Sequence, residues 1–152
     1  MTFCKEKSLS FISESEEETK GFALSFSEKL LQQKTKIVAF SGDLGAGKTR
    51  FIKGMLNYFS NVEENEVISP TFTYMNIYPT EPTIYHFDLY RIPNEDVFIS
   101  MGFEEYFEKD GICLIEWADN ISRILPKNTI RVGITILDET KRKVEIYEHS
   151  FF

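Results

Sequence analysis

The stretch from residue 37 to residue 59 constrains the fold more than any other part of the chain. An apolar run, Ile37-Val-Ala-Phe40, leads into Gly42-Asp-Leu-Gly-Ala-Gly-Lys-Thr49, and apolar residues then recur at helical spacing. This order predicts a strand, a glycine-rich loop and a helix, the setting of a phosphate-binding loop. Glycine accepts backbone conformations that let consecutive amides face an anion at a helix N-terminus. We therefore predict that the chain binds a nucleoside triphosphate.

The last two residues of this motif have separate expected roles. Lys48 is expected to reach the β- and γ-phosphates, and the Thr49 hydroxyl to bind Mg²⁺. A capped glycine-rich turn is the alternative structure for such a stretch. The complete motif and both flanking elements favour the nucleotide site.

Length and charge limit the remaining choices. The chain has 152 residues, which suits a single domain spanning 1–152, and its formal net charge is −7. An acidic chain without a larger basic cluster than Lys141-Arg-Lys143 is a poor candidate for gripping nucleic acid by itself. No apolar run approaches a membrane span and the first residues carry no apolar signal region, so we expect a cytoplasmic protein. Cys4 and Cys113 are too few for a disulfide framework, and Cys113 is expected to be a buried hydrophobe.

The order of apolar patterns predicts an α/β fold. We expect a three-layer sandwich like that of P-loop NTPases, with a mixed central sheet and antiparallel hairpins at its edges. Ser15 and Glu18 form a capping box that begins a helix ending near residue 31. Expected helices further on span about 48–59, one or two short segments within 93–106 broken near Gly102, and 119–125. Expected strands lie near 9–12, 37–40, 83–91, 112–116, 129–137 and 143–147, and residues 67–78 are expected to begin as a loop and become a strand.

Two apolar runs end in a carboxylate. Ile84-Tyr-His-Phe is followed by Asp88, and Ile112-Cys-Leu-Ile by Glu116. An acid at the end of a strand lies at the carboxyl edge of the sheet, where ligands of open α/β sheets collect. We assign Glu116 to Mg²⁺ together with Thr49, and Asp88 to the attacking water, although the two roles could be exchanged.

Three other positions have two interpretations each. Ser69-Pro-Thr71 is either an ordinary turn or a loop ordered by the γ-phosphate and its metal. Arg91 is either a cationic finger or a surface ion-pair partner, and Trp117 is either packing or a residue near the nucleotide.

Absent motifs narrow the class of enzyme. The sequence has no Asn-Lys-x-Asp signal for guanine, and the region after Asp88 lacks the arginine-rich lid usual in small-molecule kinases. What remains is a compact ATPase that acts with another protein. A small-molecule kinase and a nucleotide-dependent protein-binding switch stay open as alternatives.

Four motifs together resemble a known family. Gly42–Thr49, Ser69-Pro-Thr-Phe-Thr73, His86-Phe-Asp-Leu-Tyr-Arg91 and Ile115-Glu-Trp117, in this order and spacing, are similar to the TsaE (YjeE) family of bacterial ATPases. The similarity covers nearly the whole chain, and the combination of His-x-Asp-Leu-Tyr-Arg with Glu-Trp is far more specific than the phosphate loop alone.

The resemblance implies a role in forming threonylcarbamoyladenosine in tRNA. Family members bind ATP and Mg²⁺ and act with a TsaB–TsaD complex, which would carry the transfer chemistry and most of the tRNA contact. Hydrolysis is expected to be slow without these partners.

The resemblance also assigns roles to residues. Catalytic roles fall on Asp88, Glu116 and Lys48, and metal binding on Thr49 and Glu116. Nucleotide contacts are expected from Thr19, Asp43, Leu44, Gly45, Ala46, Gly47, Lys48, Thr49 and the switch-loop Thr71. The chain departs from the family pattern at Ala23, Arg50 and Ala118-Asp119, and Arg50 puts a long cation beside the phosphate loop.

Overall fold

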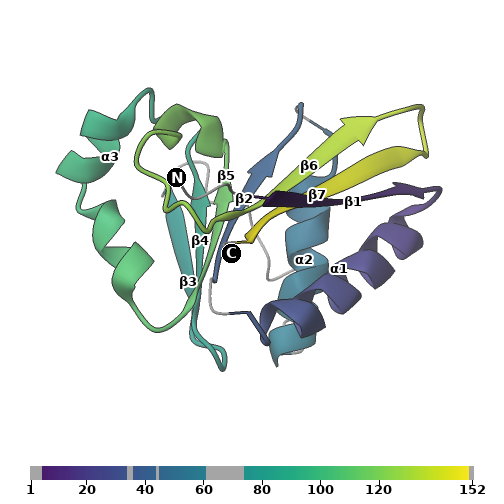
Figure 1. Cartoon of the computed structure of the whole chain (residues 1–152), viewed down its shortest axis with the longest axis horizontal. Helices are drawn as coiled ribbons and strands as arrows, with labels where there is room; N and C mark the ends of the chain where they lie inside the picture. Colours follow the sequence, from purple (N-terminus) through teal and green to yellow (C-terminus); the bar gives the residue numbers. More distant parts are fainter. Residues whose placement is uncertain (1–4, 34–35, 44, 61–73, 151–152) are drawn as a thin grey trace.

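A computed structural model describes residues 5–33, 36–43, 45–60 and 74–150 of the chain (Figure 1). Its framework is a seven-stranded sheet in the order β1-β7-β6-β2-β5-β4-β3. The strands are β1 Lys5–Ser13, β2 Ile37–Ser41, β3 Met75–Tyr78, β4 Ile84–Asp88, β5 Ile112–Glu116, β6 Ile130–Ile136 and β7 Arg142–Ser150. The α-helices are α1 Glu16–Leu30, α2 Lys48–Ser60 and α3 Glu95–Ser100, and the 3₁₀ segments are η2 Phe103–Glu108 and η3 Ala118–Ile121.

The centre of the sheet is parallel and its edges are antiparallel. Strand β2 pairs in parallel with β5 and β6, and β4 pairs in parallel with β5. The β6–β7 and β3–β4 pairs are antiparallel, and β1 completes one edge on β7. The mixed sheet with antiparallel edge hairpins agrees with the prediction. Because β2, β4 and β5 run in the same direction, their carboxyl ends meet at one edge.

Helices cover both faces of the sheet. In Figure 1, α1 and α2 lie on one side, and α3 lies on the other. The strands alternate to match: Val38 and Phe40 of β2 belong to the cluster under α1 and α2, whereas Ile37 and Ala39 belong to the cluster with α3, η2 and η3. This period-two alternation is what a sheet buried on both sides requires.

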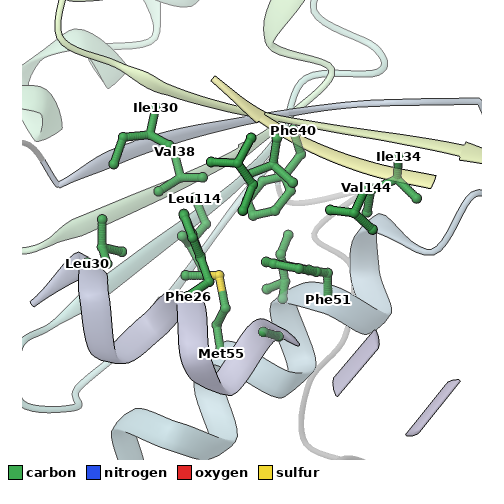
Figure 2. Close-up of a cluster of buried hydrophobic side chains, with 14 of the residues drawn as sticks. Phe26, Leu30, Val38, Phe40, Phe51, Met55, Leu114, Ile130, Ile134 and Val144 are labelled. Carbon is green, nitrogen blue, oxygen red and sulfur yellow. The ribbon is translucent and has the colours of Figure 1, made fainter. Parts of the chain in front are cut away.

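The cluster under α1 and α2 is aliphatic and aromatic together. Figure 2 shows Phe26 from α1, Phe51 and Met55 from α2, and Phe40 from β2 converging between the helices and the sheet. The Phe51 ring lies 5.8 Å from that of Phe26 and 5.7 Å from that of Phe40, measured between centroids. This packing fixes α2, and so the loop that precedes it, against the sheet.

Local signals set several boundaries as predicted. Ser15 caps α1 by accepting a hydrogen bond from the Glu18 amide at 3.1 Å, and Glu18 Oε2 accepts from the Glu14 amide at 2.8 Å. Gly102, with φ 76°, separates α3 from η2. Cys113 is buried as expected, 1% exposed within β5.

Two predicted boundaries are wrong. The helix expected over 119–125 is instead the short 3₁₀ segment η3, because amides such as that of Ser122 bond to the residue three positions back, here Asp119. The strand expected over 83–91 ends at Asp88, where its Oδ1 accepts from the Tyr90 amide and turns the chain. Residues 61–73, which include Thr71 and the first part of the loop and strand expected over 67–78, lie outside the described residues.

None of the helices in the described ranges is long and apolar enough to cross a membrane.

Candidate functional site

The glycine-rich loop leaves the carboxyl end of β2 and enters α2. Gly42 has φ 147°, and a Cβ there would lie 2.5 Å from the Ile134 carbonyl oxygen on the neighbouring strand β6. Gly45 and Gly47 have φ 80° and 105°, and a Cβ at either position would meet open space. Close packing therefore requires a glycine at 42, whereas the backbone conformation favours glycine at 45 and 47. Leu44 lies outside the described residues.

Lys48 is turned back over this loop. Its Nζ donates to the Gly42 carbonyl at 2.5 Å and lies 3.9 Å from the centroid of the Trp117 ring. Burial lowers the pKa of Lys48 from its ordinary value, while the charges of Glu116, Asp88, Asp43 and Asp119 act in the opposite direction. The ammonium group is thus held among carboxylates, a carbonyl and an aromatic face at the floor of the loop.

Glu116 connects α2 to the sheet. Its Oε1 accepts from the Thr49 hydroxyl at 3.2 Å, and its Oε2 lies 2.8 Å from Nε2 of His86 on β4. Glu116 is 3% exposed and His86 is fully buried. The first turn of α2 and the ends of β4 and β5 are therefore joined through one carboxylate.

Asp88 lies beside this carboxylate. The strand register pairs Asp88 of β4 directly with Glu116 of β5. Asp88 is also buried, and its Oδ1 accepts from the Tyr90 amide at 3.0 Å. The two acids expected from the sequence thus meet at the same edge of the sheet, next to Lys48 and Thr49.

A cavity of about 620 Å³ opens over these groups. Its volume falls within the range of small-molecule and cofactor sites. Most of the residues expected at the site line it, namely Thr19, Gly45, Ala46, Gly47, Lys48, Thr49, Asp88 and Glu116. Asp43 does not line the cavity, although its charge acts on Lys48.

The donor atoms fit a Mg²⁺ ion that is shared with a ligand. Thr49 and Glu116 supply a hydroxyl and a carboxylate in contact, and the Asp88 carboxylate is adjacent. Mg²⁺ prefers such oxygen donors and usually keeps waters and phosphate oxygens in its shell. Within the described part of the chain, no group of three His, Cys, Asp or Glu residues is arranged to hold a metal without help. The oxygen donors thus suit a metal bound together with phosphates.

The sequence matches one family model over most of its length. Residues 13–144 match the model described as threonylcarbamoyl adenosine biosynthesis protein TsaE. The chain belongs to the TsaE family. A relative in Rickettsia typhi, named tRNA threonylcarbamoyladenosine biosynthesis protein TsaE, is 41% identical over 138 residues, which cover 90% of this chain and 93% of the relative.

Further relatives agree with this placement in the TsaE family. A protein of the same name in Haemophilus influenzae is 40% identical, with 82% of this chain and 80% of the relative covered. The crystal structure of YdiB from Bacillus subtilis superposes with a TM-score of 0.76 at 28% identity and covers 96% of this chain and 88% of its own. The similarity in sequence and in structure thus spans nearly the whole chain.

In this TsaE-family chain the cavity also has walls that the sequence did not predict. The turn between β6 and β7 contributes Glu139 and Thr140, and the start of β7 contributes Arg142, whose Nε donates to the Ala46 carbonyl in the loop at 3.2 Å. These residues are about ninety positions from the loop. The sequence marks only Arg142, as part of the basic run Lys141-Arg-Lys143, and gives no sign that it reaches the site. The strand β7 is what carries Arg142 back to the loop.

The N-terminal side of the cavity was only partly predicted. Glu14, Ser15 and Glu16 line it beside Thr19, whose hydroxyl lies 2.6 Å from that of Ser13. Arg50 from α2 pairs with Glu16 at the start of α1. Arg50 and Glu16 both line the cavity, so this ion pair between two exposed side chains joins two of its walls.

Trp117 and Arg91, left open by the sequence, are placed differently. Trp117 lines the cavity in a left-handed conformation, with φ 59°, and its ring packs 5.0 Å from that of Tyr90. That conformation is rare for a large side chain and holds the ring over Lys48. Arg91 is exposed and does not line this cavity.

Proposed function

We propose that this chain is the ATP-binding and ATP-hydrolysing component of threonylcarbamoyladenosine modification of tRNA. In this proposal it is a single domain of the P-loop NTPase type, a three-layer sandwich acting in the cytoplasm. Support comes from membership of the TsaE family and from relatives whose names state tRNA threonylcarbamoyladenosine biosynthesis.

One observation carries the nucleotide part of the proposal. The cavity joins the glycine-rich loop at a helix N-terminus to the Thr49–Glu116 contact and to Asp88. Amides at a helix N-terminus attract anions, and a hydroxyl beside carboxylates attracts a hard cation. A nucleoside triphosphate with Mg²⁺ satisfies both requirements in one ligand.

Each residue then has a defined task. The amides of Gly45, Ala46 and Gly47 would bind the β-phosphate, and Lys48 would contact the β- and γ-phosphates. To do so, the Ala46 amide would leave the Asp43 carbonyl, to which it donates at 3.0 Å, and Lys48 would leave the Gly42 carbonyl. Thr49 and Glu116 would hold Mg²⁺, which neutralises phosphate charge when bound. Asp88, next to Glu116, would orient a water for attack. Its neighbour Glu116 is the acid in contact with Thr49. This contact favours Glu116 as the metal ligand and Asp88 as the residue that orients the water.

The remaining proposed contacts lie beyond these groups. Thr19 would contact the nucleotide from α1, and Asp43, Leu44 and the switch-loop Thr71 would complete the site. We propose a TsaB–TsaD complex as the partner, with tRNA contacted mainly through it, because the chain carries a net charge of −7. Small P-loop NTPases often need a partner to complete the charge-stabilising groups, so turnover should be slow for the chain alone.

The test is ATP turnover by the purified protein, alone and with TsaB and TsaD, beside a Lys48→Ala variant. We expect slow release of phosphate that rises at least about tenfold with the partners and disappears in the variant. Turnover indifferent to the partners would leave a nucleotide site and remove the link to tRNA modification.

The same assay separates the alternatives. A small-molecule kinase would transfer the labelled γ-phosphate to an acceptor instead of releasing only inorganic phosphate. A nucleotide-dependent switch would retain function when Glu116→Ala or Asp88→Ala slows hydrolysis. A driven ATPase with either change would bind its partners and stall.

A further inference from the structure

His86 is a buried polar residue without a place in the roles above. It lies in the middle of β4 with no exposed surface, opposite Leu114 of β5, and shares its side of the sheet with Ile84. Packing alone would favour an aliphatic side chain here, because burying a polar group costs free energy unless it is hydrogen-bonded. The contact of Nε2 with Glu116 Oε2, at 2.8 Å, is therefore the feature of His86 that needs an explanation.

This contact requires a proton on Nε2 of the ring. A carboxylate oxygen only accepts hydrogen bonds, so the imidazole must donate through Nε2–H. Among the described residues, Nδ1 of His86 has no hydrogen-bond partner. A bare nitrogen lone pair is cheaper to bury without a partner than an N–H group would be. The structure thus favours the tautomer with its proton on Nε2.

The carboxylate of Glu116 is consequently held from two sides. His86 fixes Oε2 and Thr49 fixes Oε1, at 2.8 and 3.2 Å. A carboxylate has about four lone-pair sites, so about two remain free to accept a cation. Partners that orient a ligating group from behind commonly change metal affinity about 10- to 100-fold when removed.

We propose that His86 is a positioning residue for the metal site: it orients Glu116, through Nε2–H, so that Oε1 stays beside Thr49. This inference rests on the proposed function, in which Thr49 and Glu116 hold Mg²⁺. In this role His86, on β4, sets the affinity for the metal without touching the metal or the nucleotide.

Two amide substitutions separate this role from simple packing. Glutamine places an N–H group about where Nε2 of histidine lies, whereas asparagine reaches only as far as Nδ1. We therefore compare His86→Gln with His86→Asn, which have the same functional group and differ in reach.

The measurement is the binding of a non-hydrolysable ATP analogue, followed by calorimetry. One series is made without metal, in excess chelator, and a second is made over a range of Mg²⁺ concentrations. For His86→Asn we expect the Mg²⁺ concentration at half-saturation of the complex to rise about tenfold, with metal-free affinity unchanged within about twofold. His86→Gln should stay within about threefold of the wild type. Thermal unfolding of each variant reports whether it folds.

A second readout uses the protein without metal or nucleotide. The chain has two histidines, so the ring nitrogens of His86 can be assigned by ¹⁵N NMR. We expect a protonated Nε2 and a bare Nδ1, and a shift of the Nε2 signal in a Glu116→Gln variant. A proton on Nδ1 instead would overturn the inference, and this readout does not depend on either His86 variant folding.

The outcomes distinguish the inference from the function beneath it. If wild-type binding is independent of Mg²⁺, the proposed metal site itself fails. If the wild type depends on Mg²⁺ and His86→Asn matches it, only the positioning role fails. Equal loss of metal-free and Mg²⁺-dependent binding in both variants would show a purely structural residue and would also overturn the inference.

Discussion

The interior of the sheet and its carboxyl edge are buried to a similar degree and differ in what they bury. Along β5, Ile112, Leu114 and Ile115 are fully buried, and Glu116, the next residue, is 3% exposed. A buried aliphatic side chain stabilises the fold by about 1.5–3 kcal/mol, whereas a buried charge lowers stability unless it is paired. Folding alone therefore explains the apolar interior. It does not explain why Lys48 and Glu116 are buried at the edge, or why His86 is buried two residues before the end of β4.

This contrast indicates how the two regions respond to substitution. The interior should lose stability when atoms are removed, in proportion to the cavity created. At the edge, ligand binding should be sensitive and stability much less so, because sites keep polar groups that a stable core would avoid. Substitutions at Phe98, Gly42, Cys113 and Lys48 test this difference.

The largest expected loss comes from Phe98→Ala in the cluster opposite α1 and α2. Phe98 of α3 is fully buried and packs on Phe87, Phe103 and Phe107, with ring centroids 5.9, 5.6 and 5.6 Å away. We expect the free energy of unfolding to fall by about 3–5 kcal/mol in urea denaturation. The matched control is Ile99→Ala, the next residue of the same helix, which is 39% exposed and should cost less than about 1 kcal/mol.

Gly42→Ala tests the junction between the two regions. The new Cβ would lie 2.5 Å from the Ile134 carbonyl oxygen, and φ at this position is 147°. We expect a loss of about 2 kcal/mol in stability, because both the contact and the conformation oppose a side chain. Gly21→Ala in α1 is the control: nothing lies within 4 Å of a Cβ there, so it should stabilise by about 0.5–1 kcal/mol. Equal effects at both glycines would contradict the crowding at Gly42.

Cys113 tests the interior through pH. Burial raises the pKa of this thiol to about 12 from an ordinary value of 9.0. Above about pH 9 the unfolded chain releases the thiol proton and the folded chain keeps it, so stability falls as pH rises. We expect this residue to remove about 1.4 kcal/mol between about pH 7 and pH 10.

The measurement is urea unfolding of wild type and Cys113→Ala at both pH values. In Cys113→Ala the stability should decrease less between the two pH values, because the contribution of the thiol is missing. The other groups titrate in both proteins and so do not contribute to the difference. An identical pH dependence in the two proteins would mean that the thiol is accessible to solvent in the folded state.

The sequence predicted features that depend on neighbouring residues better than features that depend on residues far apart in the chain. The Ser15 cap, the break at Gly102 and the glycine-rich connection between β2 and α2 depend on neighbours within a few residues, and the described residues show the cap, the break and the glycines at 42, 45 and 47. The alternation in the strands likewise predicted the sheet, because period two follows from strand geometry. The helix expected over 119–125 was wrong because a short polar segment can close its hydrogen bonds in a tighter 3₁₀ turn.

The site shows the same division. Asp88 and Glu116 were predicted as strand-end acids, and their direct pairing follows once β4 and β5 are parallel neighbours. The Arg142–Ala46 contact and the His86–Glu116 contact were not predicted, since each depends on the register of strands far apart in the chain. A buried histidine within an apolar run was the one available signal, and only its distance from Glu116 gave it a meaning.

Lys48→Met should have the smallest effect on stability and the largest on binding. Lys48 is a buried residue that burial keeps at a lowered pKa, and methionine has a similar length without the charge. The variant loses the hydrogen bond to the Gly42 carbonyl, which lowers stability, but it also no longer buries a cation, which raises stability. We therefore expect the free energy of unfolding to change by less than about 1 kcal/mol. Binding of ATP should become undetectable in the same calorimetric assay.

The change of stability with pH provides a second test of Lys48, because the direction of its contribution can be stated. Because the folded-state pKa of Lys48 is lowered, the unfolded chain binds more protons as pH approaches 10.5, and the contribution of Lys48 to stability rises with pH. This slope is opposite to that of Cys113 and should be missing in Lys48→Met. Lys53→Met, the same change on the same helix, controls for the replacement itself. A loss in Lys48→Met as large as that in Phe98→Ala would mean that the carboxyl edge is part of the stabilising core, and the contrast between the two regions would no longer hold.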